Sequence, residues 1–156
     1  MESDKVVANN RKARHEYEIL ETVEAGLVLL GTEVKSIREG QVNFKDSYAT
    51  ITNSEAWLVG FHISPYVRGT HANHEPDRRR KLLLHRGEIG RLLGKTAERG
   101  LTLVPLRLYF KEGRAKIEIG LARGRKLHDK RSALRERETR REMDKAIRER
   151  GRGSAR

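Results

Sequence analysis

Alternating apolar and polar residues predict short β-strands along the first part of the chain. Between His15 and Val23, apolar residues fall mainly at odd positions, which is typical of a half-buried strand. The apolar run Leu27–Leu30 predicts a second strand, and Glu24–Gly26 is expected to form the turn between the two. Residues 1–9 are short and polar, and we expect them to be a frayed terminus.

Four further strands are predicted as two hairpins. They are Ser47–Thr52 with Ala56–Phe61, and Leu101–Phe110 with Arg114–Leu121. In the first hairpin, Trp57, Val59 and Phe61 alternate onto one face, and we expect that face to pack in or near the core. In the second, Pro105 removes a backbone donor and indicates a sheet edge or a bulge.

Two helices complete the predicted elements. A short helix is expected from Glu33 to about Glu39, capped by Thr32. An amphipathic helix is expected over Arg86–Arg99, with an apolar stripe made of Ile89, Leu92, Leu93 and Ala97. Residues 64–81 between them read as a long loop, which is usually functional or mobile. The fold class is therefore mainly β: an antiparallel barrel of about six strands with two or three helices.

Charge narrows this picture to a barrel of the oligonucleotide-binding type. The 156-residue chain carries a net charge of +12 and has a pI of about 10.4, so the expected partner is a polyanion. Residues 1–122 contribute +4 and residues 123–156 contribute +8. We therefore expect a barrel domain over 1–122 and a basic tail over 123–156 that is disordered when free and becomes helical on a polyanion.

The sequence also bounds the cellular setting. With no cysteine, disulfides and thiolate zinc sites are excluded, and a reducing compartment is permitted. The start of the chain lacks the apolar region of a signal peptide, and no apolar run is long enough to span a bilayer. We expect a cytoplasmic monomer with no membrane association.

The strongest chemical signal is a set of cations near the N-terminus: Arg11, Lys12, Arg14, Lys35 and Arg38. Such residues neutralise phosphates, and no acidic residue balances them locally in the sequence. The basic run Arg78–Lys81 adds to them. Because only 5% of residues are aromatic, recognition of folded RNA by shape fits better than base stacking. Glu24 beside the cluster could accept a hydrogen bond from a ribose hydroxyl or a base.

Two other segments of the chain contain residues that suggest chemistry other than RNA binding. His71 and His74 could bind a divalent metal, as in a metal-dependent nuclease, although the sequence places no third ligand. The segment Gly90–Thr96 resembles a phosphate-binding loop, but it has three residues between its glycines where four are needed. A structural ribosomal RNA-binding protein is a further alternative.

At the level of motifs, the chain resembles the SsrA-binding protein family over nearly its whole length. The resemblance rests on segments in the right order, namely Asn10–Tyr17, Glu24–Gly26, Gly31–Arg38, Asp46–Tyr48, Arg80–Leu84, Gly120–Gly124 and Lys126–Arg131. It implies a bacterial protein with an oligonucleotide-binding barrel, which is not an enzyme and needs no cofactor. The implied function is to bind the tRNA-like domain of transfer-messenger RNA and deliver it to stalled ribosomes in trans-translation.

The resemblance also implies roles for individual residues. Positions matching Asn10, Glu24 and Leu83 would contact the RNA, together with the surrounding cations. Residues in the tail would act in the decoding region of the ribosome: Lys126, His128, Asp129, Lys130 and Arg131. The tail would become helical in the vacant mRNA path. Elongation factor Tu and alanyl-tRNA synthetase would be indirect partners that act on the RNA. The N-terminal extension is shorter here than in many family members.

Overall fold

Nine strands and three helices lie in the residues that the computed structural model describes, 5–68, 73–98 and 100–125. The helices are α1 (Arg11–Glu16), α2 (Gly31–Arg38) and α3 (Arg86–Thr96). The strands are β1 (Lys5–Asn9), β2 (Tyr17–Leu27), β3 (Val42–Asn43), β4 (Tyr48–Thr52), β5 (Glu55–Val59), β6 (His62–Ile63), β7 (Arg80–Leu83), β8 (Leu101–Lys111) and β9 (Arg114–Gly124). None of the helices in these ranges has the length and apolar character needed to cross a membrane.

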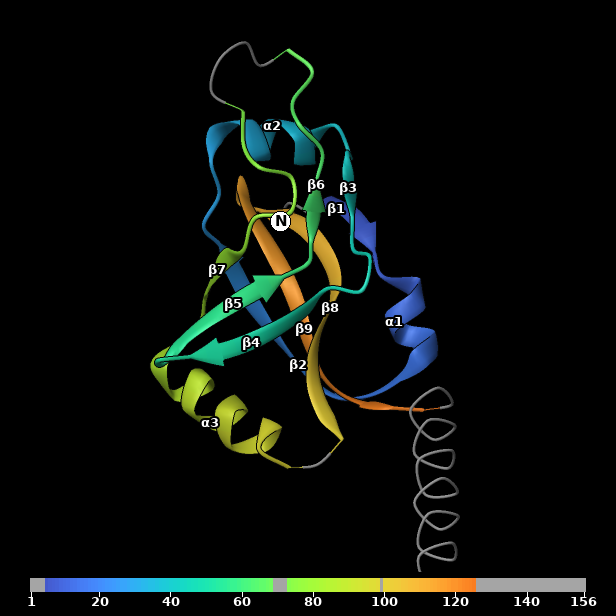
Figure 1. Cartoon of the computed structure of the whole chain (residues 1–156), viewed down its shortest axis with the longest axis vertical. Coiled ribbons are helices and arrows are strands. Elements are labelled where there is room, and N and C mark those ends of the chain that lie inside the picture. The colour runs from blue at the N-terminus through green and yellow to red at the C-terminus, as the bar shows by residue number, and fades with distance from the viewer. Residues whose placement is uncertain (1–4, 69–72, 99, 126–156) are drawn as a thin grey trace, which may run out of the picture.

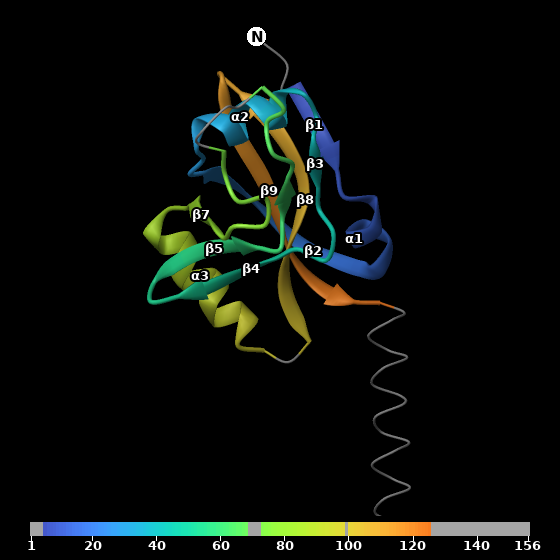
Figure 2. The same ribbon diagram turned by 45° about the horizontal axis from the view of Figure 1, so that its top comes forward.

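Six antiparallel strands close into a ring. Their order is β8-β4-β5-β7-β2-β9, and β9 pairs back to β8. β1 pairs with the C-terminal half of β8, and β3 forms a separate ribbon with β6. Figure 1 shows α2 near one end of the ring, α1 at its side and α3 toward the other end, and Figure 2 shows the same arrangement tilted. The prediction of a mainly β, antiparallel architecture with about six strands and three helices is confirmed.

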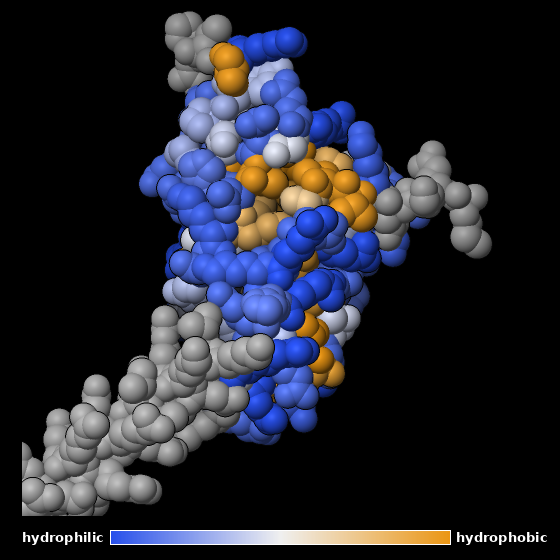
Figure 3. Space-filling view, turned by 90° about the vertical axis from the view of Figure 1, so that its right-hand side faces the viewer, coloured by the Kyte–Doolittle hydropathy of each residue, from blue (hydrophilic) through white to orange (hydrophobic). Residues whose placement is uncertain are grey.

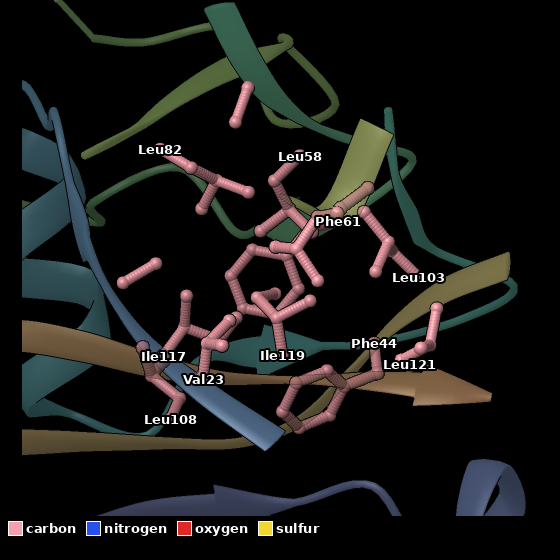
Figure 4. Close-up of a cluster of buried hydrophobic side chains, with 14 of the residues drawn as sticks. Val23, Phe44, Leu58, Phe61, Leu82, Leu103, Leu108, Ile117, Ile119 and Leu121 are labelled. Atoms are coloured by element: carbon pink, nitrogen blue, oxygen red, sulfur yellow. The ribbon is translucent and has the colours of Figure 1, made fainter. Parts of the chain in front are cut away.

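The main core fills the inside of this ring. It gathers inward-facing residues of all six strands, such as Leu58, Leu82, Leu108 and Ile119, around the rings of Phe44 and Phe61 (Figure 4). Two helices add one fully buried side chain each, Ile37 from α2 and Leu92 from α3. The helices at the ends of the ring thus close the core that the strands enclose.

A second, smaller cluster lies on the outside of the ring, under α1. Ala13 of α1 packs there against Leu106, and the cluster is completed by Val104, Ala122, Tyr17 and Ile19. Adjacent residues of β9 serve the two clusters, because successive side chains of a strand point to opposite faces. Gly120 leaves the space that this packing needs, since a Cβ there would lie 2.8 Å from a methyl carbon of Leu106.

The N-terminal third differs from its prediction in four ways. Residues 5–9 form β1, so the expectation of a frayed terminus was wrong for them. Arg11–Glu16 is a helix. The turn predicted at Glu24–Gly26 is also wrong: β2 is one strand that continues through it, because β9 pairs with β2 as far as Gly26. A separate strand was predicted over Leu27–Leu30. Instead, β2 ends at Leu27, and Val28 and Leu30 are exposed.

The first predicted hairpin is present as β4 and β5, with Asn53 and Ser54 at positive φ in the turn. Its faces are reversed relative to the prediction. Ala56 and Leu58 are buried, whereas Trp57 is only half-buried. Phe61 still reaches the core, because Gly60 takes φ +80° and breaks the alternation.

The second predicted hairpin, β8 and β9, is confirmed, and its turn lies at Glu112 and Gly113. Pro105 lies at a bulge, as predicted, because the register shifts between Pro105 and Arg107. β9 continues to Gly124, two residues beyond the predicted domain boundary, and the Arg125 amide bonds to the carbonyl of Glu16. Residues 126–156 lie outside the described ranges.

Candidate nucleic-acid interface

Residues from four strands form two parallel rows on the outside of the ring, which we call the outer face. Their inward neighbours on each strand fill the core, so these residues point outward. Strand register places them side by side. The first row is Leu83, Gly26, Lys116 and Tyr109, and the second is Glu24, Glu118 and Arg107. Two predicted RNA contacts, Glu24 and Leu83, thus lie on one surface although they are distant in sequence.

Glu24 lies on β2, and its carboxylate accepts hydrogen bonds from two residues of β8, the strand on the other side of β9. The Tyr109 hydroxyl donates to its Oε1 at 2.5 Å, and Lys111 Nζ lies 3.5 Å from its Oε2. The hydrogen bond from Tyr109 lowers the pKa of Glu24 most; burial opposes this, and Lys111 adds to the lowering. Burial and the bond to Glu24 raise the pKa of Tyr109. Near neutral pH, Glu24 is therefore an anion and Tyr109 remains a donor.

Arg14 reaches the same face from α1. Its Nη2 lies 3.2 Å from Oε1 of Glu118, while Arg107 Nε lies 3.3 Å from Oε2 of the same carboxylate. The Arg107 guanidinium also stacks 4.3 Å from the centre of the Tyr109 ring. Contacts thus run continuously from Arg14 through Glu118, Arg107 and Tyr109 to Glu24.

Leu83 pairs with Gly26, which lies two residues from Glu24 on β2, and Leu83 is 53% exposed. Gly26 allows this close approach, because a Cβ there would lie 3.3 Å from Cβ of Leu83. Beside Leu83 lies a groove of about 640 Å³ between β7 and α3, to which Ile89 and Leu93 contribute. The apolar stripe of α3 was expected to pack against the core. It lies mostly at the surface, since Leu92 is its one buried member.

Asn10, another predicted contact, is buried, and both polar atoms of its side chain have protein partners. Its Oδ1 accepts from the Ala13 amide and caps α1, and its Nδ2 donates to the carbonyl of Pro105 at 2.8 Å. Its own amide donates to the carbonyl of Leu106. In this structure Asn10 joins α1 to the bulge of β8, so its geometry favours an effect on the interface through the position of α1.

The other predicted cations point in different directions. Arg11 is exposed on α1, and Lys12 bonds to Asp46 at 2.8 Å. Lys35 lies over the ring of Tyr66 and Arg38 over that of Phe110, both from α2. Of the predicted cations, Arg14 is the one whose recorded partner belongs to the outer face. The inference that acids do not balance these cations holds only along the sequence, since Asp46 and Glu118 balance two of them in space.

The basic run Arg78–Lys81 has mainly a structural role. Arg78 and Arg80 both donate to the fully buried carboxylate of Glu33, with Arg80 Nε 2.6 Å from Oε2. Arg80 also donates to backbone carbonyls of Phe61 and Pro76. Burial alone would raise the pKa of Glu33, but its bonds to Arg78, the Leu30 amide and Arg80 outweigh burial and lower it. This run therefore adds fewer surface cations than predicted.

Both ring nitrogens of His74 are occupied by protein partners. Nε2 lies 2.8 Å from the carbonyl oxygen of Ile63, which only accepts, so this nitrogen donates. Nδ1 then accepts from the Thr32 hydroxyl at 2.9 Å. Thr32 had been predicted to cap α2. Instead it bonds to His74, and Leu30 lies at the cap position. His71 lies outside the described residues, and no group of metal-binding side chains occurs within them. His74 is therefore not available as a metal ligand in the nuclease alternative.

A further groove lies between β1 and β3, near α1. It measures about 680 Å³, and its apolar lining is Ala8, Val42 and Phe44. Arg11 and Lys12 border it. Figure 3 views this side and shows apolar surface bordered by hydrophilic side chains. The groove opens beside α1, apart from the residues that surround Glu24.

Comparison with known proteins decides the family. The family model described as SmpB protein matches residues 7–149. The chain belongs to the SmpB family. It is 61% identical over 147 residues to the SsrA-binding protein of Desulforudis audaxviator (strain MP104C), covering 94% of this chain and 96% of that one. It is 60% identical over 147 residues to the SsrA-binding protein of Carboxydothermus hydrogenoformans, covering 94% and 99%.

A solved structure agrees with the SmpB assignment. A chain from "tmRNA-SmpB: a journey to the center of the bacterial ribosome" is similar to this chain with a TM-score of 0.66 and 57% identity. The match covers 76% of this chain and 84% of that chain. The resemblance inferred from the motifs is thereby confirmed at the level of the family.

Within this SmpB fold, sequence reasoning missed four side chains of the outer face: Arg107, Tyr109, Lys116 and Glu118. A signal for them exists, because they alternate with core residues on the β8–β9 hairpin, which the pattern predicts. The pattern does not show that β2 pairs with β9 and brings Glu24 next to these residues. The tail residues Lys126, His128, Asp129, Lys130 and Arg131 lie outside the described residues, so their role stays a prediction.

Proposed function

We propose that this SmpB-family protein binds the tRNA-like domain of transfer-messenger RNA and delivers it to stalled ribosomes for trans-translation. Its relatives at about 60% identity are SsrA-binding proteins, and a similar solved chain belongs to a tmRNA–SmpB ribosome structure. The family consists of RNA-binding proteins and not of enzymes. In this proposal the ring of strands is an oligonucleotide-binding-type barrel that acts in the cytoplasm as a monomer.

The observation that carries the proposal is the outer face around Glu24. A carboxylate on a basic protein repels phosphate, so it favours RNA only where a ribose hydroxyl or a base N–H can donate to it. Arg14 and Lys111 nearby supply attraction for the phosphate backbone. The exposed Leu83 offers an apolar contact on the same surface. Together these groups combine salt-dependent attraction with a selective acceptor.

The tail has a separate role in this proposal. Its basic residues, including Lys126, His128 and the Asp129–Arg131 motif, act in the decoding region of the ribosome. Elongation factor Tu and alanyl-tRNA synthetase act on the bound RNA. The division is supported by the charge distribution, since residues 123–156 carry two thirds of the net positive charge.

The proposal is tested by titrating the protein with the tRNA-like domain and with an ordinary tRNA over a series of salt concentrations. Glu24→Ala should weaken binding to the tRNA-like domain by about 1–3 kcal/mol, the range for a hydrogen bond to a charged group. Glu18→Ala is the matched control, because Glu18 is an exposed carboxylate on the same strand. Equal binding by Glu24→Ala and the wild type at matched salt would rule out contact through Glu24.

Removing the tail tests the second role. The chain should be cut after Arg125, because Arg125 Nε donates to the carbonyl of Tyr17 and its amide to that of Glu16. The shortened protein should bind the tRNA-like domain but fail to support peptide tagging in a reconstituted translation reaction. Tagging at the wild-type level would contradict the division into two regions.

A further inference from the structure

Tyr109 makes the closest recorded contact to Glu24, and no motif singles it out. Its hydroxyl lies 2.5 Å from Oε1, whereas the Lys111 ammonium lies 3.5 Å from Oε2. Tyr109 is only 3% exposed, so its donor is fixed in place, while the Glu24 side chain is 37% exposed. One oxygen of Glu24 is thus firmly engaged, and the other keeps capacity for a new donor.

The Tyr109 ring is itself held in place. The Arg107 guanidinium covers one face at 4.3 Å, and Arg107 is anchored by Glu118 across the β8–β9 pair. Glu118 also bonds Arg14 of α1. A side chain that packing and neighbouring bonds lock in this way can hold a partner to within about 0.5 Å.

Glu24 needs such an orienting partner because of its position. Strand register sets it directly opposite Glu118, and like charges in this arrangement repel. To reach Tyr109, Glu24 extends past β9, a span of about 9–10 Å between alternate strands. Without the Tyr109 donor, the carboxylate would turn further toward Lys111, which already lies 3.5 Å from Oε2, or toward Lys116; both cations favour its charged form.

We propose that Tyr109 is a positioning residue that determines RNA selectivity, because it turns Oε2 of Glu24 outward to accept from a ribose hydroxyl or a base N–H. The inference rests on the proposed function, since it requires RNA on the outer face. Tyr109 itself does not touch RNA in this arrangement. Its contribution is the direction of a carboxylate that rejects phosphate and accepts a hydrogen bond from a donor.

The experiment is Tyr109→Phe, which removes one oxygen and keeps the ring. Affinity for the tRNA-like domain should fall about 3- to 10-fold, within the range for one hydrogen bond. The slope of log affinity against log salt should stay unchanged, because no phosphate contact is lost. A change of slope by a full unit would overturn the inference. 3-Fluorotyrosine at position 109 keeps both ring and donor, and it should bind like the wild type.

Two measurements separate positioning from general loosening. In a Glu24→Gln background, Tyr109→Phe should cause no further loss of affinity; an undiminished loss would overturn the inference. Carboxyl ¹³C NMR should show the pKa of Glu24 rising in Tyr109→Phe, since the phenol bond contributes most to its lowering. In the wild type, adding RNA should shift the Glu24 carboxyl resonance, and an unchanged resonance would also overturn it.

The two proposals fail in different ways. If Glu24→Ala weakens binding and Tyr109→Phe does not, the positioning role is wrong and the proposed function stands. If neither variant weakens binding, contact through Glu24 is wrong and the positioning role is lost with it. Cooperative unfolding of each variant, followed by circular dichroism, establishes that the proteins compared are folded.

Discussion

Two carboxylates, Glu24 and Glu33, lie in clusters of similar composition and opposite character. Glu33 is fully buried, and both its oxygens are bonded by Arg78, Arg80 and the Leu30 amide. Glu24 is 37% exposed, its shortest recorded bond comes from Tyr109, and Lys111 lies 3.5 Å from its other oxygen. Both lie beside basic residues in space, and both have a lowered pKa. The number of charges therefore does not separate a binding site from a structural ion pair.

The difference lies in remaining hydrogen-bonding capacity. The Glu33 cluster connects the start of α2 to β7 and to the carbonyls of Phe61 and Pro76, with no exposed oxygen left. A ligand gains nothing there, whereas removing one partner leaves a buried charge uncompensated. The Glu24 cluster keeps an accessible acceptor, so a ligand can complete it. Stability should depend on the first cluster and RNA affinity on the second.

The largest expected effect is on stability. Arg80→Ala should lower the free energy of unfolding by about 3–5 kcal/mol, because Glu33 loses a buried partner. Arg79→Ala is the matched control in the same basic run. Arg79 lies over the Trp57 ring at the surface, so its loss should cost about 0.5–1 kcal/mol. Urea denaturation measures both, and equal losses would remove the distinction between the clusters.

The pH dependence of unfolding gives the next effect. The folded-state pKa of Glu33 is below its usual 4.5, so its ionised form adds stability above pH 4.5 that is lost as pH falls through the folded-state pKa. Glu33→Gln resembles the protonated form. It should be about 1.5–3 kcal/mol less stable than the wild type at pH 7. That gap should shrink progressively below pH 4.5, and a constant gap would contradict the assigned role.

The smallest effect on stability is expected at Glu24. Glu24→Gln should change the free energy of unfolding by less than about 1 kcal/mol, because the group is partly exposed and its loss relieves repulsion from Glu118. RNA affinity should fall in the same variant. Parallel urea and binding titrations test this, and a loss as large as that of Arg80→Ala would place Glu24 in the structural class.

Local pattern was sufficient for a large part of the fold. Period-two alternation and turn residues predicted β8 and β9, the bulge at Pro105 and the hairpin of β4 and β5. The charge distribution and the ordered motifs indicated RNA binding and the family. These features depend on residues close together in the chain, which is why one sequence reveals them.

Errors arose where distant strands decide the outcome. Glu24–Gly26 has the composition of a turn, yet β9 pairs with it and makes it strand. Trp57 looked like core, yet ring closure turned Ala56 and Leu58 inward. In each case a gain in tertiary packing or backbone pairing outweighed a weak local preference.

The sequence by itself therefore determined the class of protein: a basic, mainly β, RNA-binding member of its family. Tertiary structure alone decided which charged residues are available to a ligand. Glu33 meets Arg80 across 47 positions and Glu24 meets Tyr109 across 85. The closed ring brings these partners together by pairing strands that are remote in sequence. Its pleat then buries one carboxylate and leaves the other at the surface, and no local pattern encodes that choice.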